Sequence, residues 1–211
     1  RKIAILLDSS SSMTDEILID VIRRKNSPDS NKMAGPKWQR AKRIVNWLLA
    51  RLPAQSNVTV ITFDAMARQL GQSDWVSARD AAALGAITRD LDATVPLGST
   101  NLQAGLEAVK RQKPTNIYLI TDGLPTEGDS SYKSLSPFAD CSALWGASNK
   151  ISGECRLQLF NHTLASSAPR SGVPVNVILL PIEGDPEASP AYWYWASTSG
   201  GLMISPAETW P

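Results

Sequence analysis

Residues 1–13 read RKIAILLDSSSSM, and this stretch decides the fold of the 211-residue chain. Ile3 to Leu7 form a continuous apolar run between charged residues, which is typical of a β-strand covered on both faces of a sheet. The run ends at Asp8, and four serines follow it. A carboxylate and several hydroxyls at a strand tip suit a phosphate or nucleophile site, a flexible polar loop, or a site for a hard cation.

Similar apolar runs occur further along the chain, and helical patterns lie between them. The expected strands are residues 58–63 (VTVITF), 117–120 (IYLI) and 173–180 (VPVNVILL), with a short last strand at 202–205. The expected helices are residues 36–52, where apolar residues recur at helical spacing before Pro53, and residues 80–91, 102–111, 157–166 and 191–197. Strands that alternate with helices predict βαβ units, and therefore a mainly parallel sheet between layers of helices.

Composition and charge narrow the class of protein. The chain is 43% hydrophobic and 19% charged, with a net charge of +1. These values fit one soluble α/β domain and give no basic excess for a nucleic-acid partner. No apolar run reaches the roughly 18 residues of a membrane span, so we expect no membrane insertion of this segment. Because the sequence starts inside a strand and without Met, we expect a domain excised from a longer parent protein, for which a membrane anchor is one option.

Two segments are longer than connections in such a fold usually are, and both begin just after a strand. They are residues 14–36 and 126–156, and the second contains Cys141 and Cys155. A bridge between the cysteines would close a loop of about 15 residues and stabilise the fold by about 3 kcal/mol. Two buried thiols are the alternative. A bridge would favour an extracytoplasmic location, and free thiols a cytoplasmic one.

Oxygen donors gather at the carboxyl edge of the expected sheet, which is where open α/β sheets bind ligands. They lie in residues 8–12 (DSSSS), 98–101 (GSTN) and 121–123 (TDG). Alternation along an extended turn points Ser10 and Ser12 the same way as Asp8. Two carboxylates and three hydroxyls suit Mg²⁺, which takes about six oxygen ligands at about 2.1 Å.

The order of these motifs resembles a known family. Asp-x-Ser-x-Ser, then Gly-Ser-Thr-Asn before a helix, then Thr-Asp-Gly-x-Pro-Thr after a strand is similar to the von Willebrand factor A (vWA) domain and its metal-ion-dependent adhesion site. The resemblance extends from IAILLD to GGLMIS, and ITDGLPTEG resembles bacterial members. It implies a single domain over residues 1–211 with a three-layer α/β/α, Rossmann-like fold. The mostly parallel sheet would have six strands, with a short antiparallel edge strand near residues 67–70.

The resemblance also implies which residues bind the metal. Ser10, Ser12 and Thr100 would bind it directly, and Asp8 and Asp122 largely through water. The metal would be Mg²⁺, with Mn²⁺ and Ca²⁺ as alternatives, and it would bind an Asp or Glu side chain of a protein partner. The expected function is therefore metal-dependent protein–protein binding, with specificity from residues 14–36 and 126–156. We expect Asp8 and Thr100 to face solvent, so that Asp8→Ala or Thr100→Ala should abolish partner binding and leave the fold nearly intact.

Two alternatives compete with this function. In a Mg²⁺-dependent hydrolase Asp8 would be a phosphoryl-accepting nucleophile, but haloacid-dehalogenase-type sites resemble Asp-x-Asp, and position 10 is serine. The one histidine, His162, lies in an expected helix, and no serine has a Gly-x-Ser-x-Gly setting. We therefore expect no enzyme. The second alternative is a vWA scaffold with a non-functional metal site, although no ligand is missing from the sequence.

Two further clusters are expected to be structural. In residues 192–195 (YWYW), helical spacing puts Tyr192 and Trp195 on one face, which predicts packing on the sheet rather than a ligand platform. The basic run at residues 23–25 (RRK) is expected to be a solvated helix end, where cations offset the helix dipole.

Overall fold

The computed structural model describes residues 1–128 and 153–211. Its strands are β1 (Lys2–Asp8), β2 (Asn57–Phe63), β3 (Ala67–Gln69), β4 (Val76–Ser77), β5 (Asn116–Thr121), β6 (Val175–Leu179) and β7 (Met203–Ile204). Its helices are the 3₁₀ turn η1 (Ser11–Thr14) and α1 (Leu18–Lys25), α2 (Asp29–Met33), α3 (Pro36–Ala50), α4 (Ala81–Ala93), α5 (Leu102–Gln112), α6 (Gly153–Ser167) and α7 (Ala188–Ser199). Each strand and helix named from the sequence is present, with ends that differ by a few residues.

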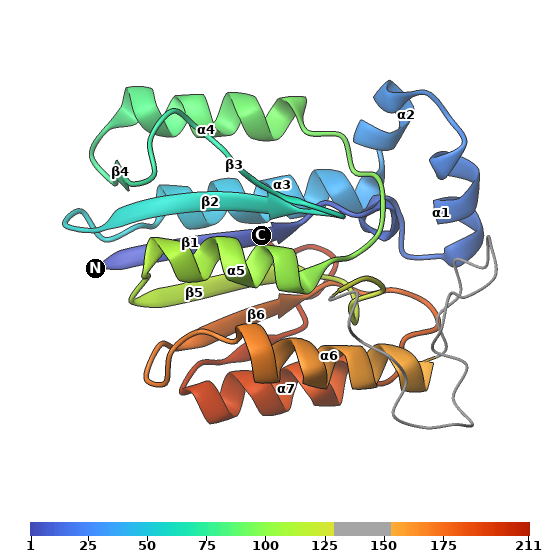
Figure 1. Ribbon diagram of the computed structural model, residues 1–211. Coiled ribbons are helices and arrows are strands. Elements are labelled where there is room, and N and C mark those ends of the chain that lie inside the picture. Colours follow the sequence, from blue (N-terminus) through green and yellow to red (C-terminus); the bar gives the residue numbers. More distant parts are fainter. Residues whose placement is uncertain (129–152) are drawn as a thin grey trace.

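The strands form one sheet in the order β3-β2-β1-β5-β6-β7 (Figure 1). β1 pairs in parallel with β2 and β5, and β6 pairs in parallel with β5 and β7. β3 and the two-residue β4 both pair antiparallel with β2. The expected antiparallel edge strand is confirmed as β3. Because β4 also joins, the described part of the sheet has seven strands rather than six.

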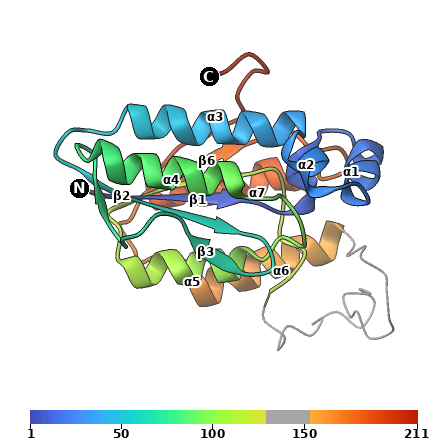
Figure 2. The ribbon, with the colours of Figure 1, turned by 90° about the horizontal axis from the view of Figure 1, so that it is seen from above.

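Helices cover both faces of the sheet, which gives the three predicted layers (Figure 2). Successive side chains of β1 point to opposite faces, so Ile5 and Leu7 belong to one buried cluster and Ala4 and Leu6 to another. The first cluster includes residues of α3 and α4, and the second includes residues of α5, α6 and α7. A strand buried on both faces explains the continuous apolar run in the sequence.

Residues 14–36 form α1 and α2 beside the carboxyl end of β1 (Figure 1). Arg24 fixes this segment, because its Nε and Nη2 donate to the two carboxylate oxygens of Asp15 at 2.7 and 3.0 Å, and its Nη1 donates to the carbonyl of Asn31 at 2.8 Å. The prediction of a solvated helix end at residues 23–25 is therefore wrong for Arg24, which has a buried carboxylate partner.

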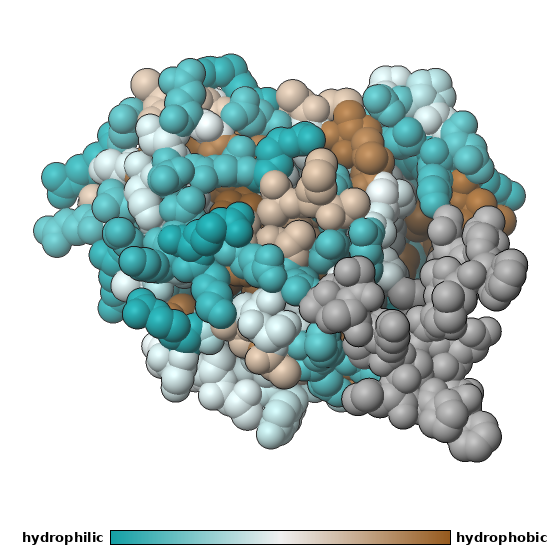
Figure 3. Space-filling model, in the orientation of Figure 1, coloured by the Kyte–Doolittle hydropathy of each residue, from teal (hydrophilic) through white to brown (hydrophobic). Residues whose placement is uncertain are grey.

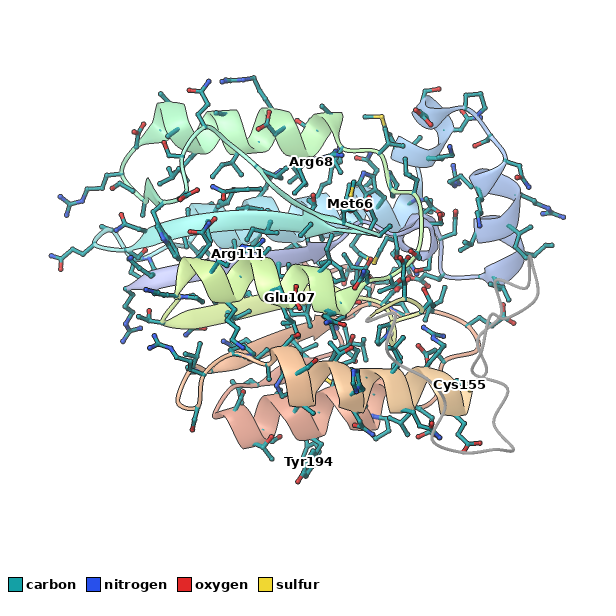
Figure 4. All side chains as sticks on the ribbon, viewed as in Figure 1. Met66, Arg68, Glu107, Arg111, Cys155 and Tyr194 are labelled. Carbon is teal, nitrogen blue, oxygen red and sulfur yellow. The ribbon has the colours of Figure 1, made fainter. Side chains whose placement is uncertain are left out.

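The aromatic cluster behaves as helical spacing predicts. Tyr192 and Trp195 are buried, whereas Trp193 and Tyr194 are 58% and 67% exposed. Tyr194 points away from the body of the molecule in Figure 4. The pair that faces inward packs edge-on against Phe160 of α6, with ring centroids 5.0 and 6.0 Å from it. The cluster is thus half core and half surface.

Most of residues 126–156 lies outside the described part of the chain. Cys155 is buried at the start of α6 (Figure 4), and Cys141 is not among the described residues. The disulfide bridge therefore stays a prediction. Within the described ranges, no helix combines the length and the apolar character that crossing a membrane requires.

Candidate metal centre

The site begins where β1 ends. Asp8 is fully buried, and its two oxygens are both occupied: Oδ1 accepts from the backbone N–H of Ser10 at 2.9 Å, and Oδ2 accepts from the hydroxyl of Thr121 at 2.7 Å. Thr121 is the last residue of the neighbouring strand β5. The tips of two parallel strands are thereby held together, and Asp122 follows directly at the same edge.

A chain of hydroxyls connects the other predicted residues. The Thr100 hydroxyl donates to Ser10 Oγ at 2.9 Å, Ser10 Oγ lies 3.2 Å from Ser12 Oγ, and Ser12 Oγ donates to Asp122 Oδ1 at 3.0 Å. Together with Asp8, these are the five residues that the sequence proposed as ligands. They come from three distant parts of the chain, and the structure places them in one cluster.

Backbone hydrogen bonds hold Thr100 in this cluster. On one side, Leu97 N–H donates to the carbonyl of Ser9 at 2.9 Å, and Ser11 N–H donates to the carbonyl of Gly98 at 3.1 Å. On the other side, the carbonyl of Thr100 accepts from Thr126 N–H at 2.9 Å. The loop before α5 is thus tied both to the serine loop and to the start of residues 126–156.

Four of the five candidate ligands are buried, so the expectation that Asp8 and Thr100 face solvent is wrong. Asp8, Ser10, Thr100 and Asp122 are at most 6% exposed, and only Ser12 is partly open. Burial and, after it, the negative charge of Asp122 raise the pKa of Asp8 to about 7, although hydrogen bonds from Ser10 and Thr121 act against the shift. Two buried carboxylates in one cluster favour a nearby cation.

One such cation belongs to the chain itself, and sequence reasoning missed it. The side chain of Lys37 is fully buried, and its Nζ lies 2.7 Å from Asp122 Oδ2 and 3.0 Å from the carbonyl of Pro181. Lys37 stands in the first turn of α3, where a positive charge opposes the helix dipole. No local signal in the sequence identifies it, because a lysine in the first turn of a helix usually lies at the surface.

Gly35 allows this approach. A Cβ on Gly35 would lie 2.6 Å from the carbonyl oxygen of Thr14, a distance that atoms do not tolerate. Glycine therefore brings the start of α3 against η1, and Lys37 follows within the first turn. The position of the lysine depends on a close backbone contact rather than on the apolar pattern of the helix.

Hydrogen bonds with two other side chains hold the turn after Asp122 in place. Tyr192 of α7 donates its hydroxyl to the carbonyl of Gly123 at 2.9 Å, and Asp185 Oδ2 accepts from Leu124 N–H at 2.7 Å. The same carboxylate pairs with Arg156 at 2.8 Å. A Cβ on Gly123 would lie 2.5 Å from Asp185 Oδ2. Glycine is therefore required here so that the buried carboxylate can reach the turn.

The donors suit a hard dication. Around a six-coordinate ion with metal–oxygen distances of about 2.1 Å, neighbouring oxygens lie about 3.0 Å apart. The hydroxyl contacts from Thr100 through Ser10 and Ser12 to Asp122 measure 2.9, 3.2 and 3.0 Å, close to that spacing. Within residues 1–128 and 153–211, no three His, Cys, Asp or Glu side chains form a metal-binding group, so the candidate depends on its hydroxyls.

The family model for the von Willebrand factor type A domain matches residues 3–124, which is more than half of the chain and includes every candidate ligand. The chain therefore belongs to the von Willebrand factor type A domain family. No curated protein sequence is similar enough to count as a relative.

Solved structures share the fold at low sequence identity. A von Willebrand factor type A protein from Catenulispora acidiphila matches 99% of this chain with a TM-score of 0.59 and 14% identity, although the chain spans only 39% of that protein. An aerotolerance-related membrane protein from Bacteroides fragilis matches 98% of the chain, which spans 91% of it, at a TM-score of 0.52 and 18% identity. The PilB minor pilin from Streptococcus sanguinis matches 96% of the chain at a TM-score of 0.55 and 17% identity, over 56% of the pilin. At these identities the likeness establishes the vWA fold alone.

Proposed function

We propose that this vWA domain binds a protein partner through a divalent metal ion, and that Ser10, Ser12 and Thr100 hold the ion directly while Asp8 and Asp122 act largely through water. Mg²⁺ is the proposed metal, with Mn²⁺ and Ca²⁺ as alternatives. The observation that supports this most is the spacing of 2.9 and 3.2 Å between the hydroxyl oxygens of Thr100, Ser10 and Ser12, because it lets metal bonds replace hydrogen bonds with little movement.

The metal would supply a strongly polarising positive centre at the carboxyl edge of the sheet. All three proposed direct ligands are neutral hydroxyls, so the bound ion would keep most of its charge and attract an Asp or Glu side chain of the partner. Catalysis is not part of the proposal, because Asp122, the carboxylate that accepts from the Ser12 hydroxyl, is already paired with Lys37. Phosphatase or esterase turnover that needs Mg²⁺ and disappears in Asp8→Asn would contradict it.

The segment that begins at Thr14 offers the partner an apolar contact. Ile17, Leu18, Ile19 and Ile22 are each 45% to 53% exposed, on and just before α1. They follow the serine loop along the chain, and hydrophobic surface is visible on the side of the molecule where α1 lies (Figure 3). Exposed apolar residues beside a candidate binding site are a feature of protein interfaces. The proposal also includes two structural points. Residues 14–36 and 126–156 would determine which partner binds, and residues 1–211 would form a single domain.

A domain of this fold can serve in assembly, since one structure that shares it is a minor pilin. The chain covers only part of that protein, so the partner, the anchoring and the role of any longer parent belong to the proposal too. A partner that presents a carboxylate beside apolar residues would match both the metal and α1.

Calorimetric titration of Mg²⁺ and Mn²⁺ into wild type and Thr100→Ala tests the metal. We expect saturable binding to wild type and a loss of roughly tenfold or more in Thr100→Ala, because one oxygen ligand is gone. Thr94→Ala is the matched control: Thr94 is similarly buried, and its hydroxyl donates to the carbonyl of Asp90 in α4 rather than to a candidate ligand. Equal affinity in all three proteins would contradict the assignment.

The partner is tested by capture from the source lysate with Mg²⁺ or with chelator. We expect a protein that is retained by wild type only when Mg²⁺ is present, and that is lost with Thr100→Ala and weakened with Ile19→Ser. Retention that ignores chelator and Thr100→Ala alike would rule out a metal bridge.

A further inference from the structure

Lys37 lies inside the candidate site, in contact with one of its two carboxylates. Its ammonium group is completely buried and contacts Asp122, one of the two carboxylates, on the oxygen that Ser12 does not use. Removing a lysine from water costs several kcal/mol unless the charge is paired. Asp122 supplies that pairing, and the carbonyl of Pro181 accepts a second hydrogen bond.

The charge of Lys37 also helps to lower the pKa of Asp15, but the direct partners of the surrounding carboxylates are arginines. Asp15 has its own partner in Arg24, and Asp185 has its own partner in Arg156. Among the buried charged side chains of the cluster itself, that leaves Asp8, Asp122 and Lys37. When both carboxylates are ionised, the set carries one negative charge, and a bound dication would change it to one positive charge.

From this charge balance we infer that Lys37 is a built-in counter-ion, which stabilises the metal-free site and weakens the binding of a divalent ion. It also leaves the loaded site with a net positive charge, which an acidic side chain of the partner can neutralise. The inference rests on the proposed metal site. It adds that metal and partner bind cooperatively, because each supplies charge that the other requires.

Two physical effects indicate that Lys37 weakens the binding of a divalent ion. The ammonium group of Lys37, fixed on Asp122, would repel a dication held in the same cluster, because screening by water is weak at a fully buried position. In addition, Lys37 occupies Asp122 Oδ2 and so reduces what this carboxylate can offer to an ion. Without metal, the same ammonium offsets the repulsion between Asp8 and Asp122.

Lys37→Met and Lys37→Gln test the inference, with Lys42→Met as the matched control. Lys42 is on the same helix but pairs with Asp92 at the surface, 3.1 Å away. We expect Mg²⁺ to bind both Lys37 variants roughly tenfold or more tightly than wild type, a difference of about 1.4 kcal/mol or more. Their melting temperatures without metal should be lower than that of wild type, and Lys42→Met should change neither quantity.

Opposite changes in affinity and stability are the signature, since loss of a merely structural lysine would lower stability without tightening metal binding. Equal or weaker Mg²⁺ binding in both Lys37 variants would mean that the lysine only positions Asp122, and would overturn the inference while leaving the proposed function intact. If no protein binds Mg²⁺, the proposed function and the inference both fail. Binding by the variants alone would show that the lysine blocks the site.

The counter-ion role can still be tested if a Lys37 variant is unfolded without metal. In that case, Mg²⁺ must restore the helical circular dichroism signal, because the dication replaces the missing positive charge. The same concentration of NaCl serves as the control for ionic strength. A variant that stays unfolded in Mg²⁺ would contradict the counter-ion role.

Discussion

At the scale of single residues, the site depends on the residues that pack against the candidate ligands as much as on the ligands themselves. Asp122 is followed by a glycine that has no room for a side chain, and Lys37 occupies one of its oxygens. Asp8 is likewise held by Thr121 from the next strand. These contacts explain why four of the five candidate ligands are buried although a ligand must reach them.

Gly123→Ala should destabilise the fold by about 1–3 kcal/mol, because its Cβ would meet a carboxylate that cannot move away easily. Asp185 Oδ2 already binds Leu124 N–H and Arg156. Urea unfolding followed by circular dichroism measures the change. Gly85→Ala in α4 is the control, since the nearest atom to its Cβ would be 3.8 Å away. A free energy of unfolding unchanged by Gly123→Ala would mean that the Asp185 contact can relax.

At the scale of elements, an ion pair helps to hold α1 on the domain, together with the buried side chain of Val21 and a hydrogen bond from Leu18 N–H to Glu183. Arg24 binds Asp15 with two hydrogen bonds, and Asp15 is only 5% exposed. Burial alone would raise the pKa of Asp15, but hydrogen bonds from Arg24 and Thr14 together with the charge of Arg24 lower it. The pair therefore contributes stability while Asp15 is ionised.

Arg24→Met should lower the free energy of unfolding by about 1–3 kcal/mol near neutral pH, because it leaves a buried carboxylate without its partner. A lowered pKa gives stability that is present above the unfolded pKa and is lost as the pH falls through the folded one. The difference between wild type and variant should thus be complete near neutral pH and shrink below about pH 4.

Urea unfolding at a series of pH values measures this difference. Arg23→Met is the control, because Arg23 is largely exposed and its contact with Asp20 is 3.4 Å long. If the difference between wild type and Arg24→Met stayed constant down to pH 3, the ionisation of Asp15 would not be the source of the stability.

At the scale of the whole molecule, the candidate site joins segments that are far apart in sequence. Residues 8–12, 100 and 122 meet only because β1 lies between β2 and β5, and because the loop before α5 returns to the tip of β1. An ion bound there would cross-link the centre of the sheet. Binding should therefore stabilise the global fold rather than one loop.

Mg²⁺ should raise the melting temperature of wild type in a saturable way. At a hundredfold excess over Kd the stabilisation is about 2.7 kcal/mol, and each kcal/mol moves the melting temperature of a domain of this size by about 2–4 °C. Thr100→Ala should show little of this shift. A melting curve of wild type that is identical with millimolar Mg²⁺ and with chelator would contradict the proposed metal.

The apolar pattern of the sequence by itself determined the order of strands and helices, the parallel sheet and the three layers. The reason is physical: a strand such as β1, buried on both faces, must be apolar throughout, and that pattern is readable without coordinates. Local turn chemistry likewise predicted oxygen donors in residues 8–12, 98–101 and 121–123, because parallel strands bring their carboxyl ends to one edge. The family resemblance then implied the five candidate ligands among them.

Only the tertiary structure decided the burial of those ligands, the pairing of Arg24 with Asp15, and the presence of Lys37 beside Asp122. Each of these depends on contacts between residues separated by 9 to 113 positions in the chain. No local pattern encodes such contacts. A lysine in the first turn of a helix looks like a surface residue until the fold places a carboxylate against it.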